Sequence, residues 1–540
     1  ESGGIKKEDA FISLSKIFEN PDVKLIFHNA KFDIKILVSN GYDFISKAKC
    51  EIIDTMIAAW VLNPESLNRS SFSLEKLSEL KLGLVGIEFD EIVQKNQTFA
   101  DVPLEKAIPY AAEDADFTFQ LWQKLETELS QNNLSELFYN IEMKLLPILC
   151  SMEIEGIHLE SSELLSYDKE LTEKLSEIEQ KIYSTVGHEF NIASTKQLQE
   201  VLFTELKLTP EKKTKTGYST DTSVLENLSY VNPVPKMILE YRELAKLQST
   251  YVQTLPKMTD IHSRIHPDFI QTGTATGRLS CREPNLQNIP VRNESGRRIR
   301  TAFTAEKRKV LISADYSQIE LVVLANLSKD KNMGDAFLNG IDVHKATAAL
   351  IFGVKPEEVT SEMRRTAKTI NFGVIYGMSA FRLAKDLEIS RTQASQFINS
   401  YFETYKSIKD FMNEIIINAE KTGYVQTIMG RKRKITYINT KNKTERAAAE
   451  RIAINTPIQG SAADIVKKAM IDVSDELKNT KSNAKLLLQV HDELILECPD
   501  NQEEIDKTIL LLKNKMENSV KLDIPLKVSI EYGKNWGEFH

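Results

Sequence analysis

The pattern of hydrophobic and polar positions divides the chain into segments of different kinds. From residue 1 to about 128, short apolar runs such as Val23 to Phe27 alternate with helical repeats, as in an α/β domain. From about 140 to 260 the pattern is helical. Leucine and isoleucine recur at helical spacing from Leu164 to Ile182, and a second long helix is predicted from Pro235 to Tyr251. We therefore expect a helical arm in this segment.

Strand patterns return after residue 260. They are clearest at Lys309 to Ser313 and Leu486 to Val490, with a helix-rich stretch from about 325 to 450 between them. Strands so distant in sequence can pair in one sheet, with the helical stretch inserted as a separate lobe. Within the helical arm, Glu211 to Thr220 is polar, basic and contains glycine, which predicts a mobile loop tip. A solvated surface loop and a contact to a DNA backbone remain open for that segment.

Composition predicts a globular protein of several domains. At 540 residues the chain is too long for one core, and 41% hydrophobic with 27% charged residues excludes the disordered class. Because no run approaches the roughly 18 apolar residues of a membrane span, we expect a soluble protein. Four separated cysteines predict neither a zinc site nor a disulfide framework and favour the cytoplasm. The chain begins at Glu1 without a secretory signal, so we expect a fragment or a processed chain.

A net charge of −8 does not suggest a nucleic-acid partner, but phosphate binding requires only local clusters of lysine and arginine. Two such clusters are Arg297, Arg298 and Arg300, and the run from Arg431 to Lys434. Each is a candidate DNA contact. A solvated surface run is the alternative for both.

Acidic residues stand at the ends of two predicted strands. KVLISADYSQIE carries an apolar strand to Asp315 and changes to a helical pattern near Gln318, and KLLLQVHDELILEC predicts a hairpin with His491, Asp492 and Glu493 at its turn. Taken singly, each acid is explained as a turn residue or a cap. Taken together, they suggest a Mg²⁺ site, because two ions about 4 Å apart, held by a few carboxylates and substrate phosphates, support phosphoryl transfer.

A basic and aromatic stripe follows in RRTAKTINFGVIYG, where Arg364, Lys368, Phe372 and Tyr376 recur at i, i+4 spacing. One interpretation is a solvated basic turn that runs into a core stripe. In the functional interpretation, the two cations bind a triphosphate, Phe372 contacts a sugar or base, and Tyr376 lies near a template.

Three segments resemble motifs A, B and C of the family A DNA polymerases of the bacterial polymerase I type, in this order: DYSQIE, RRTAKTINFGVIYG and QVHDE. Two further segments extend the resemblance to nearly the whole chain, TATGRLSCREPNLQNIPVRN and RIAINTPIQGSAAD. It implies an α/β and α+β multidomain fold, in which a ribonuclease H-like 3′→5′ exonuclease domain precedes a right-hand polymerase. The expected parts are an exonuclease-like domain (1–128), a helical thumb (129–262), a palm of antiparallel sheet (263–328 and 451–540) and helical fingers (329–450).

The resemblance also implies roles for individual residues. Asp315, Asp492 and the Tyr316 carbonyl would bind two Mg²⁺ ions, with Mn²⁺ as an alternative, Glu493 would lie close by, and Lys368 would be a candidate acid for the leaving pyrophosphate. Glu320 would be a steric gate whose side chain clashes with a ribose 2′ hydroxyl. The implied nucleotide-binding residues are Glu320, His344, Arg364, Lys368, Phe372 and Tyr376, with Phe372 selecting against dideoxynucleotides. The implied DNA-binding residues are Arg278, Asn285, Gln287, Asn288, Arg292, Arg451, Asn455, Gln459 and His491.

One position departs from the family pattern, because Val322 stands where arginine commonly follows DYSQIEL. We predict altered primer-template handling without loss of chemistry.

The amino-terminal segment resembles a 3′→5′ exonuclease in two of its three motifs. FHNAKFD supplies Asn29 and Asp33, and YAAEDAD supplies Tyr110 and Asp114, but no Asp-x-Glu motif precedes them. Either the chain begins after that strand, or the motif has degenerated and the domain is a scaffold. Two acids alone would bind a pair of metal ions poorly.

The sequence therefore predicts a DNA-directed DNA polymerase acting in replication or repair on primer-template DNA and deoxynucleoside triphosphates. We expect a monomer in a bacterial or viral cytoplasm, with an organelle as the alternative. A single-subunit RNA polymerase is a rival hypothesis that Glu320 and the exonuclease-like segment disfavour. A catalytically inactive DNA-binding protein is another, disfavoured by Asp315 and Asp492.

Overall fold

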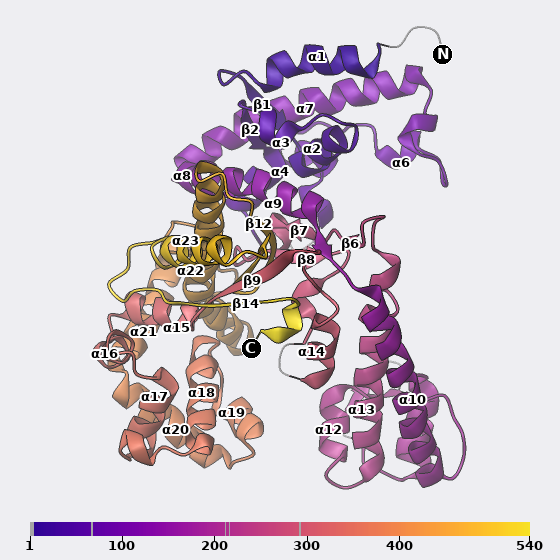
Figure 1. The fold of residues 1–540 in the computed structure, drawn as a ribbon. Helices are drawn as coiled ribbons and strands as arrows, with labels where there is room; N and C mark the ends of the chain where they lie inside the picture. The colour runs from indigo at the N-terminus through magenta and orange to yellow at the C-terminus, as the bar shows by residue number, and fades with distance from the viewer. Residues whose placement is uncertain (1–4, 66–68, 211, 215–216, 291–292, 540) are drawn as a thin grey trace.

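The computed structural model describes residues 5–539 except 66–68, 211, 215–216 and 291–292. Figure 1 shows the amino-terminal domain at one end, a sheet in the middle, and two helical lobes that extend from the sheet on either side of a gap. Segments from the middle and the end of the chain meet in that sheet.

The amino-terminal domain contains two parallel strands, β1 (Lys24–Phe27) and β2 (Glu51–Asp54), in a register that places Phe27 opposite Asp54. The predicted run from Val23 to Phe27 is therefore a strand. Buried Ile34, Ile53 and Trp60 belong to the core that joins these strands to the helices. The helices of this domain are α1 (Lys7–Phe18), α2 (Ala30–Ser39), α3 (Phe44–Lys47), α4 (Thr55–Leu62), α5 (Leu74–Leu82), α6 (Phe89–Ile92) and α7 (Leu104–Gln131).

The segment expected to form the thumb divides into two parts. After α8 (Ser135–Leu137), helix α9 (Lys144–Glu155) packs against α2, α22 (Lys443–Asn479) and β12 (Lys485–Val490). Residues 144–155 thus lie between the amino-terminal domain and the sheet. The arm itself begins with α10 (Ser161–Val186).

Helix α10 packs against α13 (Pro233–Leu247), so both long helices predicted for this segment are present. The periodic side chains from Leu164 to Ile182 are buried in their interface. Between the helices, parts of the predicted loop form a small hairpin of β4 (Lys213–Thr214) and β5 (Gly217–Tyr218), while residues 211 and 215–216 lie outside the described ranges. The arm is completed by α11 (Thr195–Gln199) and α12 (Thr222–Leu228).

The central sheet is antiparallel and has the strand order β12-β13-β9-β14. Its strands come from two distant parts of the sequence, as predicted. The bounds are β9 (Lys309–Tyr316), β12 (Lys485–Val490), β13 (Glu493–Pro499) and β14 (Val528–Gly533). The long helix α22 (Lys443–Asn479) packs against α23 (Gln502–Glu517), which also contacts β9, β13 and β14. Smaller pairs join β3 (Ile157–His158) to β6 (Arg264–Ile265), β7 (Asp268–Ile270) to β8 (Ser280–Arg282), and β10 (Tyr424–Gln426) to β11 (Lys432–Lys434).

The helix-rich stretch forms the second lobe, opposite the arm in Figure 1. Its helices are α16 (Lys331–Leu338), α17 (Val343–Phe352), α18 (Ser361–Ile375), α19 (Ala380–Leu387), α20 (Arg391–Thr404) and α21 (Lys406–Thr422). Two helices flank β9 in the sequence: α14 (Glu294–Arg300) precedes it, and α15 (Ile319–Ser328), in the segment expected to be palm, follows it. Across the described ranges, no helix has both the length and the apolar character of a membrane span.

Candidate active site

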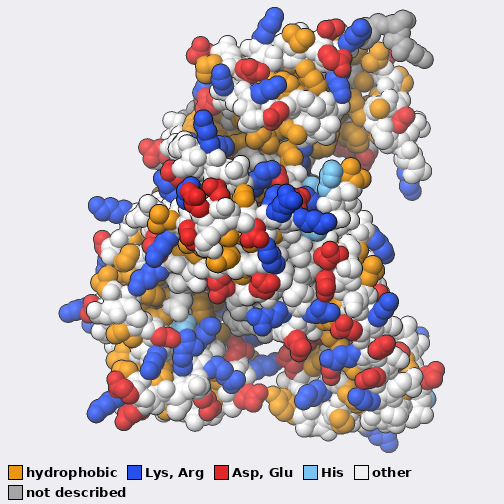
Figure 2. Space-filling model, viewed as in Figure 1, with side chains coloured by type: hydrophobic (Ala, Val, Ile, Leu, Met, Phe, Trp, Pro, Cys, Tyr) orange, Lys and Arg blue, Asp and Glu red, His pale blue; other side chains and the backbone are white. Residues whose placement is uncertain are grey.

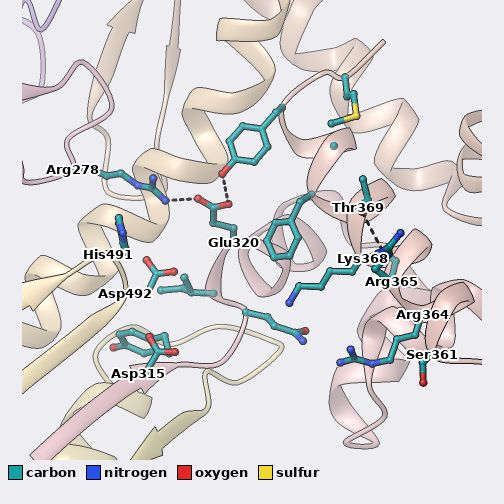
Figure 3. Close-up of a pocket in the computed structure, with 17 residues that line it drawn as sticks. Arg278, Asp315, Glu320, Ser361, Arg364, Arg365, Lys368, Thr369, His491 and Asp492 are labelled. Atoms are coloured by element: carbon teal, nitrogen blue, oxygen red, sulfur yellow. Dashed lines mark hydrogen bonds and ion pairs between the residues drawn. The ribbon is translucent and has the colours of Figure 1, made fainter. Parts of the chain in front are cut away.

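A cavity of about 940 Å³ lies between the sheet and α18. Figure 3 shows carboxylates from the strand side facing cations from α18 across it. The lining includes Arg278, Asp315, Tyr316, Gln318, Glu320, Arg364, Arg365, Lys368, Phe372, Tyr376, Met378, His491 and Asp492. Most of the predicted nucleotide-binding side chains therefore line the same space as the paired acids.

Sheet pairing brings the predicted acids together. Asp315 is near the end of β9 and lies directly opposite Glu493 of β13 in the register. The Tyr316 backbone N–H donates to the carbonyl of Asp492 at 3.2 Å, which fixes the turn beside the end of β9. The predicted hairpin is present, and His491 in its turn has a left-handed φ of 55°.

Glu493 faces a different partner from Asp492. Its side chain is buried and accepts a hydrogen bond of 2.6 Å from the Ser313 hydroxyl. Glu493 is not among the residues that line the cavity. It thus lies close to Asp315, and its side chain contacts Ser313 of the same neighbouring strand, β9.

The electrostatics of the carboxylates favour a bound cation. Burial raises the pKa of Asp492, and the nearby Arg278 only partly opposes that shift. Burial likewise raises the pKa of Glu320, again with Arg278 opposing it. An added cation would stabilise the ionised forms.

The donor set fits hard divalent metal ions. Asp315 and Asp492 supply carboxylate oxygens at the cavity, and Tyr316 also lines it. Throughout the described ranges there is no cluster of three or more His, Cys, Asp and Glu side chains suited to a metal. Two carboxylates leave coordination positions for substrate oxygens, which is how Mg²⁺ commonly binds at phosphoryl-transfer sites.

Glu320 is held from two sides. It lies on α15 with 5% of its surface exposed, and its carboxylate is paired with the Arg278 guanidinium. The Tyr376 hydroxyl donates to its other oxygen at 3.2 Å, and both contacts are dashed in Figure 3. The predicted gate residue is thus fixed beside Asp492 by one residue before the sheet and one at the end of α18.

Helix α18 presents the predicted basic and aromatic stripe to the cavity. Arg364, Lys368 and Phe372 line it, and the Arg364 guanidinium is paired with Asp342 at 2.7 Å. The helix ends at Ile375, so Tyr376 is its C-cap residue and not a further helical position. Sequence reasoning missed Asp342, which also caps α17 through the N–H groups of His344 and Lys345.

His344 is not brought into the cavity. Its side chain is 1% exposed, its Nδ1 is 3.0 Å from the Asn371 amide nitrogen, and its ring centroid is 5.7 Å from that of Phe372. Burial lowers its pKa to about 4, so the imidazole is neutral at pH 7. In this conformation His344 supports Phe372 from behind.

The predicted DNA contacts are only partly at the cavity. Arg278 and His491 line it, while the Gln287 amide donates to Gln489 and the Asn455 amide donates to Gln459. Of the others, Asn288 and Arg451 are exposed and Asn285 is half-buried, and Arg292 lies outside the described residues.

Both basic clusters proposed as DNA contacts have described protein partners. Arg300 is buried with its guanidinium carbon 4.1 Å from the centroid of Trp536, and Arg298 pairs with Glu163 and Glu170. Arg431 is buried between Glu142 and Asp464, and the Arg297 side chain donates to the carbonyl of Gly537. Neither cluster is simply a solvated run. Figure 2 shows basic and acidic side chains interspersed over the visible face.

The predicted exonuclease residues surround a second hollow, of about 740 Å³. Asn29, Asp33 and Asp114 line it together with Glu75, which sequence reasoning missed. Burial and the neighbouring Asp54 raise the pKa of Asp33 to about 6, and burial with Glu75 raises that of Asp114 to about 6. Tyr110 hydrogen-bonds Asp114, and burial raises its pKa to about 12. Both acids are therefore harder to ionise, mainly because they are buried and secondarily because another acid lies nearby.

Comparison with known proteins agrees with this architecture. The model of DNA polymerase family A matches residues 161–538, and the model described as 3′-5′ exonuclease matches residues 4–130. The chain belongs to DNA polymerase family A. In it, an exonuclease domain is followed by the polymerase domain, and proteins of this family generally use divalent metal ions.

Curated relatives include DNA polymerase I of Treponema pallidum, 48% identical over 527 residues and covering 98% of this chain and 52% of that protein. DNA polymerase I of Borreliella burgdorferi is 45% identical over 539 residues, covering 99% of this chain and 58% of the relative. This chain thus spans little more than half of each relative. A solved structure titled as the POL domain of Pol1 from M. smegmatis in complex with DNA primer-template and dNTP has a TM-score of 0.89 at 35% identity, covering 99% of this chain and 89% of that one.

Proposed function

We propose that this chain is a DNA-directed DNA polymerase that extends the 3′ end of a DNA primer with deoxynucleoside triphosphates in replication or repair. The observation that carries the proposal is the meeting of Asp315 and Asp492 on one side of a cavity whose other side presents Arg364 and Lys368. The similar M. smegmatis structure holds primer-template DNA and dNTP, which supports the same substrates here.

The reaction would join the primer 3′ oxygen to the α-phosphorus and break the bond between that phosphorus and the leaving pyrophosphate. Asp315, Asp492 and the Tyr316 carbonyl would hold two Mg²⁺ ions, with Mn²⁺ as an alternative. When bound, these ions would neutralise charge on the attacking and leaving oxygens. Lys368 lines the cavity opposite these acids, so it would donate a proton to the pyrophosphate, while the 3′ hydroxyl proton passes to solvent.

The cations of α18 would bind the triphosphate, and Phe372 would pack on the sugar or base. In the structure the Arg364 guanidinium is paired with Asp342, so a phosphate would compete with this carboxylate for the guanidinium. Rotation of the fingers lobe, which carries both residues, would bring Arg364 towards the triphosphate. Glu320 would exclude a ribose 2′ hydroxyl by steric clash. Arg278, Asn285, Gln287, Asn288, Arg292, Arg451, Asn455, Gln459 and His491 would contact primer and template.

Primer extension with and without Mg²⁺ tests the proposal. Asp492→Ala is expected to lower extension by at least about a thousandfold, because half of the carboxylate pair is lost. Asp523→Ala is the matched control, since Asp523 is an exposed acid whose side-chain partner is Lys329. Equal extension by Asp492→Ala and the control would refute the proposed site.

Proofreading is a separate hypothesis. Asn29, Asp33, Tyr110 and Asp114 support 3′→5′ hydrolysis only if further acidic ligands complete the metal site. Degradation of a mismatched primer, compared between the wild-type chain and Asp114→Asn, tests it. Both relatives described above are bacterial, which favours a bacterial cytoplasm over an organelle.

A further inference from the structure

We propose that Trp60 of the exonuclease domain is a positioning residue for the polymerase site. Through one backbone hydrogen bond it holds the segment from Thr274 to Arg278, and that segment holds the gate residue Glu320. The inference rests on the proposed function, since it assumes that Glu320 discriminates between deoxyribose and ribose. Its consequence is that the exonuclease domain contributes to sugar selectivity.

The indole N–H of Trp60 contacts the polymerase domain. It lies on α4 and is fully buried, and its indole N–H donates to the backbone carbonyl of Thr274 at 3.0 Å. Its ring also lies near two buried cations, with the Arg431 guanidinium carbon at 4.9 Å and the Lys467 ammonium at 5.0 Å from the centroid. Thr274 is half-buried, and a partly buried carbonyl that loses its donor is destabilised, so this hydrogen bond constrains the backbone at Thr274.

The segment that follows has little room to move. The Thr274 hydroxyl donates to the carbonyl of Arg278 at 2.8 Å, which closes the segment on itself. Gly277 has a φ of 88°, and a Cβ there would lie 2.5 Å from the Arg431 Nε. A Cβ on Gly460 would lie 3.0 Å from the carbonyl of Thr276. A displacement at Thr274 would therefore be transmitted to Arg278 rather than absorbed between them.

Arg278 connects this segment to the reaction site. Its guanidinium pairs with Glu320 and is one of three side chains that hold the gate carboxylate, together with Tyr376 and Gln459. Exclusion by steric clash depends steeply on distance, so a small displacement of Glu320 changes discrimination more than it changes the rate with the correct substrate. Sugar selectivity is thus the property most sensitive to the Trp60 contact.

The test compares Trp60→Phe with Trp122→Phe. Phenylalanine retains an aromatic ring near Arg431 and Lys467 but removes the indole N–H, and Trp122 is a buried tryptophan of the same domain that packs on Phe138. We expect Trp60→Phe to lower the ratio of kcat/KM for deoxynucleotides to that for ribonucleotides by about three- to tenfold per active enzyme. Trp122→Phe should leave this ratio unchanged.

A double-mutant cycle with Glu320→Ala distinguishes a failure of the proposed role of Trp60 from a failure of the proposed gate. If Trp60 acts through Glu320, then Trp60→Phe has no further effect on the ratio in the Glu320→Ala background. The proposal is overturned if Trp60→Phe leaves the ratio at the wild-type value, or if its effect persists unchanged without Glu320. Failure of Glu320→Ala itself to change the ratio would instead refute the proposed gate. Thermal unfolding and active-site titration of each variant separate a loss of folded enzyme from a loss of selectivity.

Discussion

A buried cluster of charges lies against Trp60 of the exonuclease domain, and its central anion is Glu142, in the segment that follows this domain. Glu142 has 0% of its surface exposed and accepts hydrogen bonds from Arg431, from Lys467 at 2.7 Å and from the Gln271 amide at 2.7 Å. Lys467 and Arg431 hold its pKa at about 2. Glu142→Gln would leave two buried cations with Asp464 as the nearest remaining acid.

Breaking a buried ion pair by removing one partner costs about 3–5 kcal/mol. We expect Glu142→Gln to lower the free energy of unfolding by that amount, measured by urea denaturation at pH 7. The double variant Glu142→Gln/Lys467→Met should recover a large part of the loss, because it removes an unpaired charge as well. Glu177→Gln, at an exposed position on α10, is the control for the loss of one negative charge.

The same variant has a defined pH signature. Because the folded-state pKa of Glu142 is depressed, its contribution is present above about pH 4.5 and is lost as the pH falls towards 2. The difference between wild type and Glu142→Gln should therefore shrink on acidification. A loss below about 1 kcal/mol at pH 7, or a double variant as unstable as the sum of the single changes, would refute this view of the cluster.

Three further outcomes follow from other sites. The folded-state pKa of Asp33 is raised to about 6, so its contribution to stability is present at low pH and is lost as the pH rises through 6. Asp33→Asn should therefore raise the Tm more at pH 7.5 than at pH 4.5, and equal shifts at the two pH values would contradict this. Val322 is 2% exposed, so Val322→Arg should lower the free energy of unfolding by about 3 kcal/mol, measured by denaturant titration, besides the predicted change in DNA affinity and processivity. An unchanged midpoint of denaturation would refute the claim that burial of arginine at this position is costly. Asp342→Asn retains the cap of α17 while weakening the hold on Arg364, so KM for deoxynucleotides should fall a few-fold at constant kcat; steady-state kinetics with an unchanged KM would be the contrary result.

Much of the polymerase site was predictable because its side chains lie in short segments with strong local patterns. The strand to Asp315, the hairpin at Asp492 and the stripe on α18 follow from alternation, turn chemistry and helical spacing, and the structure confirms these elements. Local sequence patterns could not predict which side chains are buried by partners that are distant in the sequence. Arg431 matches the pattern of a surface basic run, yet its carboxylate partner Glu142 is 289 residues away. Position 322 likewise suggested a missing cation near the site, whereas the structure places Val322 in the core beneath it.

The strand order of the sheet determines when the carboxylate pair can form. The side-chain hydrogen bond between β9 and β13 joins Ser313 to Glu493 across 180 residues, and β14 closes the other edge of β9 near the end of the chain. Closing so long a loop is slow compared with forming the helices that lie between these strands in the sequence. During synthesis, β9 therefore remains unpaired until β13 and β14 have been made. A chain still on the ribosome would therefore carry a folded exonuclease domain and helical lobes while its two aspartates remain apart. Catalytic competence is then acquired in one late step.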